Sequence, residues 1–124
     1  MQRFLSLALL AFVLVGAPVL MRPAKAHSHL ARSIPAAGST VSPAPTEVVL
    51  SFAEKLEPKF SSIEVQDAKG VAVQAGKAAL DPDSRTQLRV TLKPLTPGTY
   101  KVIWRVLSVD THRTNGSFTF RVGP

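Results

Sequence analysis

The histidines of this 124-residue chain are its strongest candidates for binding a metal ion. His27 follows directly on Ala24-Lys25-Ala26, a small-x-small cleavage site. If the chain is cut after Ala26, the free amine and the imidazole of His27 close one chelate ring on a metal. Amine and imidazole nitrogens in a tetragonal arrangement suit Cu(II). The pattern therefore predicts a Cu(II) ligand that exists only after cleavage at this position.

A second pair of donors lies far along the chain, at Asp110 and His112. In an extended segment residues i and i+2 face the same way, so the two side chains would point to one place. If the N-terminal segment lies beside them, His27 and His112 meet at one end of the domain. The alternative is that Asp110 only caps backbone amides in a polar loop. Spacing alone leaves both interpretations open.

His29 would be the third residue of the cleaved chain. An amine, two amides and a third-position imidazole form a local Cu(II) chelate that needs no fold, so His29 could compete for the metal. The alternative is a surface residue on the first strand. We favour that alternative because Leu30 and Ile34 should draw this segment into the fold.

The N-terminus reads as a secretory signal peptide over residues 1–26, followed by one domain over 27–124. Arg3 precedes an apolar run, which ends in the cleavage site. Gly16 and Pro18 weaken the alternative of an uncleaved membrane anchor. The remaining 98 residues make one small domain.

Composition narrows the chemistry further. Removing Arg3, Arg22 and Lys25 lowers the formal charge from +7 to +4, and the other basic residues are scattered. The sequence therefore predicts no nucleic-acid partner. There is no cysteine, which excludes disulfides and thiolate chemistry. Both methionines, Met1 and Met21, lie in the predicted signal peptide.

Alternating apolar and polar residues predict short strands throughout the domain. The pattern indicates an all-β fold, a single two-sheet antiparallel sandwich, with a small barrel as the alternative. Asn115-Gly116 predicts a hairpin turn. The predicted strands are 46–53, 60–66, 87–92, 99–107 and 117–122. A loop is predicted at 36–45, and strand fragments and loop at 72–83.

The motifs together resemble the CopC family of periplasmic copper-binding proteins, across essentially all of 27–124. His27 after Ala-x-Ala and the stretch to Gly38 look like the family's opening "H-x-x-L-x-x-x-x-P-x-x-G". Residues 49–56 are similar to "L-x-F-S-E-x-L". Residues 97–112 are similar to "P-G-x-Y-x-V-x-W-R-x-x-S-x-D-x-H", and 116–120 to "G-x-x-x-F".

The resemblance implies a Greek-key β-sandwich of the immunoglobulin-like or cupredoxin-like kind, with one Cu(II) site. Its ligands would be His27 (amine and ring), Asp110 and His112, and Glu54 matches an acidic position near that site. The implied protein is a periplasmic copper carrier or sequestering protein in copper resistance and homeostasis, not an enzyme. The implied partner is a CopD-type inner-membrane copper importer.

The chain departs from some family members in its lack of a methionine-rich segment, and this indicates which copper ions it binds. Some family members hold a second, Cu(I) site in a methionine-rich loop with a histidine. This chain has no methionine after Met21 and no histidine near residues 72–83. We therefore expect a Cu(II)-only protein.

Two other functions stay open. An N-terminal histidine and a second histidine on a β-sandwich also describe the copper centre of lytic polysaccharide monooxygenases, although this chain is short and no exposed aromatic row is evident. A metal-free β-sandwich binding module is the other. Copper would leave the thermal stability of such a module unchanged.

Overall fold

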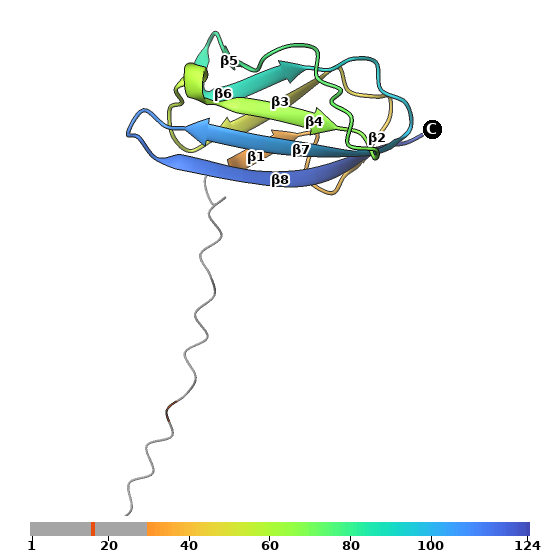
Figure 1. The fold of residues 1–124 in the computed structure, drawn as a ribbon, viewed down its shortest axis with the longest axis horizontal. Helices are drawn as coiled ribbons and strands as arrows, with labels where there is room; N and C mark the ends of the chain where they lie inside the picture. The colour runs from red at the N-terminus through yellow and green to blue at the C-terminus, as the bar shows by residue number, and fades with distance from the viewer. Residues whose placement is uncertain (1–15, 17–29) are drawn as a thin grey trace, which may run out of the picture.

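The computed structural model describes residues 30–124 and, before them, only Gly16. The predicted signal peptide, its cleavage site, His27 and His29 therefore lie outside the described part of the chain. Two four-stranded sheets pack face to face (Figure 1). The first sheet has the order β1 (Leu30–Ile34), β3 (Glu47–Phe52), β6 (Ser84–Thr91), β5 (Ala79–Asp81). The second has the order β2 (Thr40–Val41), β8 (Arg113–Val122), β7 (Gly98–Leu107), β4 (Ser62–Gln66).

This arrangement confirms the predicted all-β sandwich. The one helical element among the described residues is a 3₁₀ turn, η1 (Pro58–Phe60). No helix in the described part of the chain is long and apolar enough to cross a membrane. The predicted strand fragments at 72–83 are confirmed as β5 and as isolated bridges at Ala72 and Gln74.

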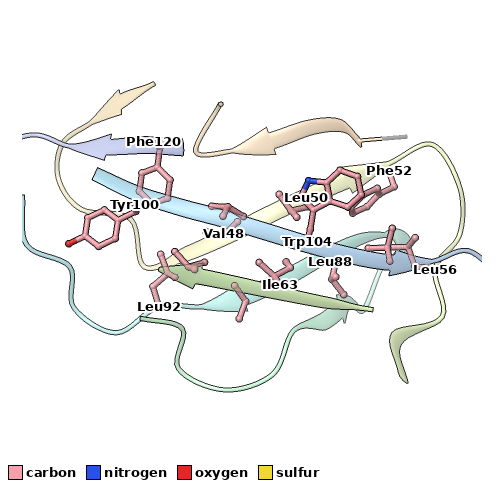
Figure 2. Packing of buried hydrophobic residues seen from close by; sticks show 14 of the residues in the cluster. Val48, Leu50, Phe52, Leu56, Ile63, Leu88, Leu92, Tyr100, Trp104 and Phe120 are labelled. Atoms are coloured by element: carbon pink, nitrogen blue, oxygen red, sulfur yellow. The ribbon is translucent and has the colours of Figure 1, made fainter. Parts of the chain in front are cut away.

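The core lies between the sheets and is built by strict alternation (Figure 2). Trp104 is 1% exposed, and its indole meets the ring of Phe52 edge-on at a centroid distance of 5.3 Å. Tyr100 stacks on Phe120 at 5.6 Å, and its hydroxyl donates to the carbonyl of Thr96. Because the inward residues are aromatic or branched, each strand has one side it must bury. The interpretation of Trp104 as core packing is confirmed.

The predicted hairpin turn at Asn115-Gly116 is wrong. Both residues lie within β8, where Asn115 faces Arg105 and Gly116 faces Trp104. β7 and β8 pair without interruption, from Gly98 opposite Val122 to Leu107 opposite Arg113. An Asn-Gly pair is a local signal, and here the long ladder with β7 overrides it. The turn instead falls at residues 108–112.

The predicted loop at 36–45 also needs a correction, because it contains the two-residue strand β2. β2 pairs in parallel with the end of β8, the one exception to antiparallel pairing among the described strands. Gly38 N donates to Thr119 O, and Gly123 N donates to Val41 O. These backbone hydrogen bonds cover the outer edge of β8. The sequence pattern did not predict that this edge is paired.

One end of the sandwich collects the segments that matter for the predicted site. Leu30, the start of β1, pairs with Phe52 at the end of β3. Leu56, just beyond β3, forms a bridge with Ser108, just beyond β7. The β7–β8 turn lies at the left end of Figure 1. We call this the site end. The described chain enters the domain here.

Candidate metal centre

The turn at 108–112 is closed by its own backbone. Ser108 N donates to His112 O at 3.0 Å, and Thr111 N donates to Ser108 O at 2.9 Å. Thr111 has a φ of 71°, in the left-handed region. The prediction that this segment is extended is therefore wrong. Asp110 and His112 are brought together by a tight turn rather than by strand alternation.

A second tie holds the turn against the segment that follows β3. Val109 N donates to Lys55 O at 2.9 Å, and Glu57 N donates to Leu107 O at 2.8 Å. These bonds place Glu54 on the segment that runs beside the turn. The position of the predicted ligands is thus determined by two strand ends.

Ser108 is the residue that organises the turn, and the sequence analysis gave it no role. It is only 4% exposed. Its hydroxyl donates to Asp110 Oδ1 and accepts from His112 N at 3.2 Å. The available signal was its place in the motif "S-x-D-x-H". A hydroxyl that carries one proton and two lone pairs suits this bridging position.

The carboxyl of Asp110 is held in its charged form. The Ser108 hydroxyl is the largest cause that lowers the pKa of Asp110, and desolvation opposes it. The backbone N–H of His112, a hydrogen bond with the Glu54 side chain and the nearby His112 charge lower this pKa further. A carboxylate that is ionised at neutral pH is the form that binds a metal ion.

The capping alternative for Asp110 is also present in the structure. His112 N lies 3.4 Å from Asp110 Oδ1. Capping and metal binding are compatible because a carboxylate has two oxygens with about four lone-pair sites. The two interpretations that the spacing left open therefore do not exclude each other.

Glu54 lies with Asp110 and His112 at the site end. Its side chain hydrogen-bonds with Asp110, and it lines a small hollow with Ser108 and His112. The remaining lining residues are Phe52, Leu56, Val106 and Thr114. Asp110 and His112 are exposed, so a metal at their side chains would be reachable from solvent. The structure thus brings together three of the five residues singled out from the sequence.

The other two, His27 and His29, cannot be placed, but the entry point of the chain can. Leu30 pairs with Phe52, which lines the hollow beside Glu54 and His112. Three residues of extended chain span about 10 Å, so His27 has the reach to approach this end. Within residues 30–124, no three His, Cys, Asp or Glu side chains are arranged to hold a metal ion by themselves. Glu54, Asp110 and His112 are therefore neighbours and not a complete donor set.

A much larger groove lies elsewhere on the described domain. It has a volume of about 720 Å³ and lies between η1, β4 and residues 74–78. Its charged lining residues are Lys59, Glu64, Lys77 and Arg105. This groove contains none of the predicted ligands, so size does not mark the candidate site.

The protein is thus a small two-sheet β-domain with an aspartate and a histidine in the turn at one end. Comparison with known proteins identifies its family. Residues 30–123 match the CopC domain, and the chain belongs to this family. Copper resistance protein C of Xanthomonas campestris pv. juglandis is 40% identical over 116 residues, which cover 89% of this chain and 91% of that protein.

Two solved structures share the fold. CopC from Methylosinus trichosporium OB3b superposes with a TM-score of 0.73 at 36% identity, covering 79% of this chain and 95% of that one. PcoC from Escherichia coli, described as a methionine-rich copper resistance protein, gives a TM-score of 0.68 at 36% identity, covering 78% and 99%. The resemblance inferred from the motifs is confirmed.

Proposed function

We propose that this protein binds one Cu(II) ion at the site end and acts as a periplasmic carrier or sequestering protein in copper resistance and homeostasis. The observation that carries the proposal is the 108–112 turn. This turn holds an ionised Asp110 and His112 next to Glu54. They lie at the end of the domain where Leu30, three residues after His27, begins β1. Relatives named copper resistance proteins support it.

The ligands in this proposal are the amine and imidazole of His27, the imidazole of His112 and a carboxylate oxygen of Asp110. Three nitrogens and one oxygen are a donor set that suits tetragonal Cu(II). Ser108 orients Asp110 and contacts the backbone of His112, in the manner of the outer-shell hydrogen bonds that position metal ligands. Glu54 supports Asp110 from the neighbouring segment through their side-chain hydrogen bond, and His29 is a surface neighbour that does not bind the metal.

The oxidation state follows from the donors that the chain lacks. Soft thioether and thiolate ligands select Cu(I). The chain has no cysteine and no methionine after Met21. The similar PcoC is described as methionine-rich, which this domain is not. We therefore propose a Cu(II)-only protein that does not hold both oxidation states at once.

In this proposal the protein acts in the periplasm, beside the inner membrane. A signal peptide at 1–26 directs the chain to the periplasm, and its cleavage after Ala26 frees the amine of His27. The protein then limits free Cu(II) or passes it to a CopD-type membrane importer. No catalytic step is required for this role.

The direct test is a Cu(II) titration of the chain that begins at His27, compared with three single variants. His112→Ala and Asp110→Asn each remove a ligand. Changes to residues that merely orient ligands cost about 10–100-fold in affinity, so each loss here should reach at least that range. His29→Ala is the matched control and should bind as the parent does.

Folding must be measured alongside affinity. Asp110 and His112 are exposed, so the melting temperatures of the metal-free variants should stay close to that of the parent. If His112→Ala and Asp110→Asn bind Cu(II) as tightly as the parent, the proposed site is wrong. If only His29→Ala loses affinity, the N-terminal chelate holds the metal instead.

A further inference from the structure

The outward face of the second sheet gathers much of the positive charge of the domain. Side chains of β7 and β8 alternate, with Tyr100, Val102, Trp104 and Phe120 directed into the core. The residues between them face outward. Four of these are basic, Lys101, Arg105, Arg113 and Arg121, and all four are exposed. We call these four residues and the strands that carry them the basic face.

Opposing charge on this face is small. β4 contributes Glu64, which faces Ile103, and its carboxylate accepts a hydrogen bond from Gln66. On the first sheet, Arg89 forms ion pairs with Glu47 and with Asp81. By sequence, the strands of the first sheet carry a formal net charge of +1 and those of the second +3, so the second sheet carries most of the predicted net charge of +4.

The basic face is long. Arg113 and Arg121 lie eight residues apart on β8, which is about 27 Å along a strand. Lys101 pairs with Thr119 and Arg105 with Asn115, so the cations occupy both strands. Small polar residues share this side of the sheet: Thr99, Asn115, Ser117 and Thr119. The partly buried Ile103 lies between Lys101 and Arg105.

Exposed apolar side chains indicate which partner fits. Protein interfaces usually contain apolar or aromatic anchors at their centre. The large apolar side chains that are most exposed among the described residues are Ile34, Phe60, Val71 and Val109. None lies on the outward side of β7 or β8. An extended array of cations without an exposed apolar anchor matches an extended anionic surface better than it matches a protein.

We propose that the basic face docks the protein flat against an anionic phospholipid bilayer. The attraction is electrostatic and reversible, because the outward apolar side chains of this face, Ile103 and Leu107, are partly buried and not free to insert. Each Lys or Arg near an anionic bilayer changes the partition coefficient about fivefold. In this pose the 108–112 turn, which leads directly into β8 at Arg113, lies at the edge of the contact. The proposal concerns membrane binding and does not depend on copper.

The experiment is vesicle co-sedimentation of the metal-free chain that begins at His27, which contains every strand of the described fold. Vesicles of phosphatidylcholine alone are compared with vesicles that also contain phosphatidylglycerol. We expect binding only to the anionic vesicles, with loss on raising the salt concentration. The variant Lys101→Gln/Arg105→Gln should partition about 25-fold less.

The matched control is Arg85→Gln/Lys93→Gln, which removes the same net charge from exposed positions on β6 and just beyond it. It should retain most of the binding. Equal loss in both variants, or no preference of the parent for anionic vesicles, would overturn the proposal. Binding to soluble polyglutamate but not to vesicles would instead identify an acidic protein surface as the partner and also overturn it.

Two further readouts keep the result interpretable. Melting curves of both double variants establish that they fold. Cu(II) affinity of Lys101→Gln/Arg105→Gln should equal that of the parent, so failure of membrane docking is distinguishable from failure of the proposed copper site.

Discussion

At the scale of single residues, the chemistry of the candidate site depends on one buried hydroxyl. Ser108 contacts the carboxylate of Asp110 and the backbone of His112, the two ligands that the described domain would supply. Its donated hydrogen bond favours the charged form of Asp110. Without this contact, an exposed aspartate in a turn would have no fixed direction and a pKa nearer its ordinary value.

Ser108→Ala should therefore raise the pKa of Asp110 in the metal-free protein. A carboxyl whose pKa is lowered in the folded state stabilises that state above its unfolded pKa of about 3.9, and the contribution is lost as the pH falls through the lowered value. The variant should lose less stability over this acidic range than the parent does. NMR titration of the side-chain carboxyl carbons measures the shift directly.

The control for this titration is Ser62→Ala, an exposed serine at the start of β4. It should leave the pKa of Asp110 unchanged. An unchanged pKa in Ser108→Ala would show that the hydroxyl does not hold the carboxylate.

At the scale of elements, the site is made by a turn whose backbone is under strain. Thr111 occupies the left-handed region at a φ of 71°, where a β-branched residue is disfavoured by about 1–2 kcal/mol. Hydrogen bonds from Thr111 N and to His112 O hold it there. The turn is thus maintained by the pairing of β7 with β8 rather than by its own preference.

Thr111→Asn should stabilise the protein by about 1 kcal/mol, because asparagine tolerates the left-handed region. Denaturant unfolding measures the change. Thr119→Asn on β8 is the matched control, since its backbone is that of an ordinary strand, and there asparagine should destabilise. Equal effects in the two variants would contradict the assignment of strain to Thr111.

The strands were largely predictable from the sequence because each has one buried side. In β7 the alternation around Trp104 is unbroken, whereas in β3 Val49 is buried along with its neighbours Val48 and Leu50. Alternation does not report backbone pairing, so β2 and the continuity of β8 through Gly116 were missed. Asp110, His112 and Glu54 were identified by type and motif. Ser108 was not, because a buried serine is unremarkable until its partners are known.

At the scale of the whole molecule, copper and folding should be linked. A ligand that binds only the folded state stabilises it by about 2.7 kcal/mol at a hundredfold excess over its Kd. Cu(II) should therefore raise the melting temperature of the chain that begins at His27. Cu(I), added anaerobically with a reductant, should have little effect because that chain has no sulfur ligand. Comparable shifts from both ions would refute the Cu(II)-only assignment.

The measurement that tests the central claim most directly is a Cu(II) EPR titration of two purified forms. One begins at His27, and the other carries a single glycine before it. The extra residue turns the amine of His27 into an amide and leaves every described contact of the domain unchanged. We predict tight binding with a nitrogen-rich tetragonal spectrum in the first form, and weakened binding with an altered spectrum in the second. Identical spectra and affinities in both forms would show that the amine of His27 is not a ligand, which contradicts the proposed site.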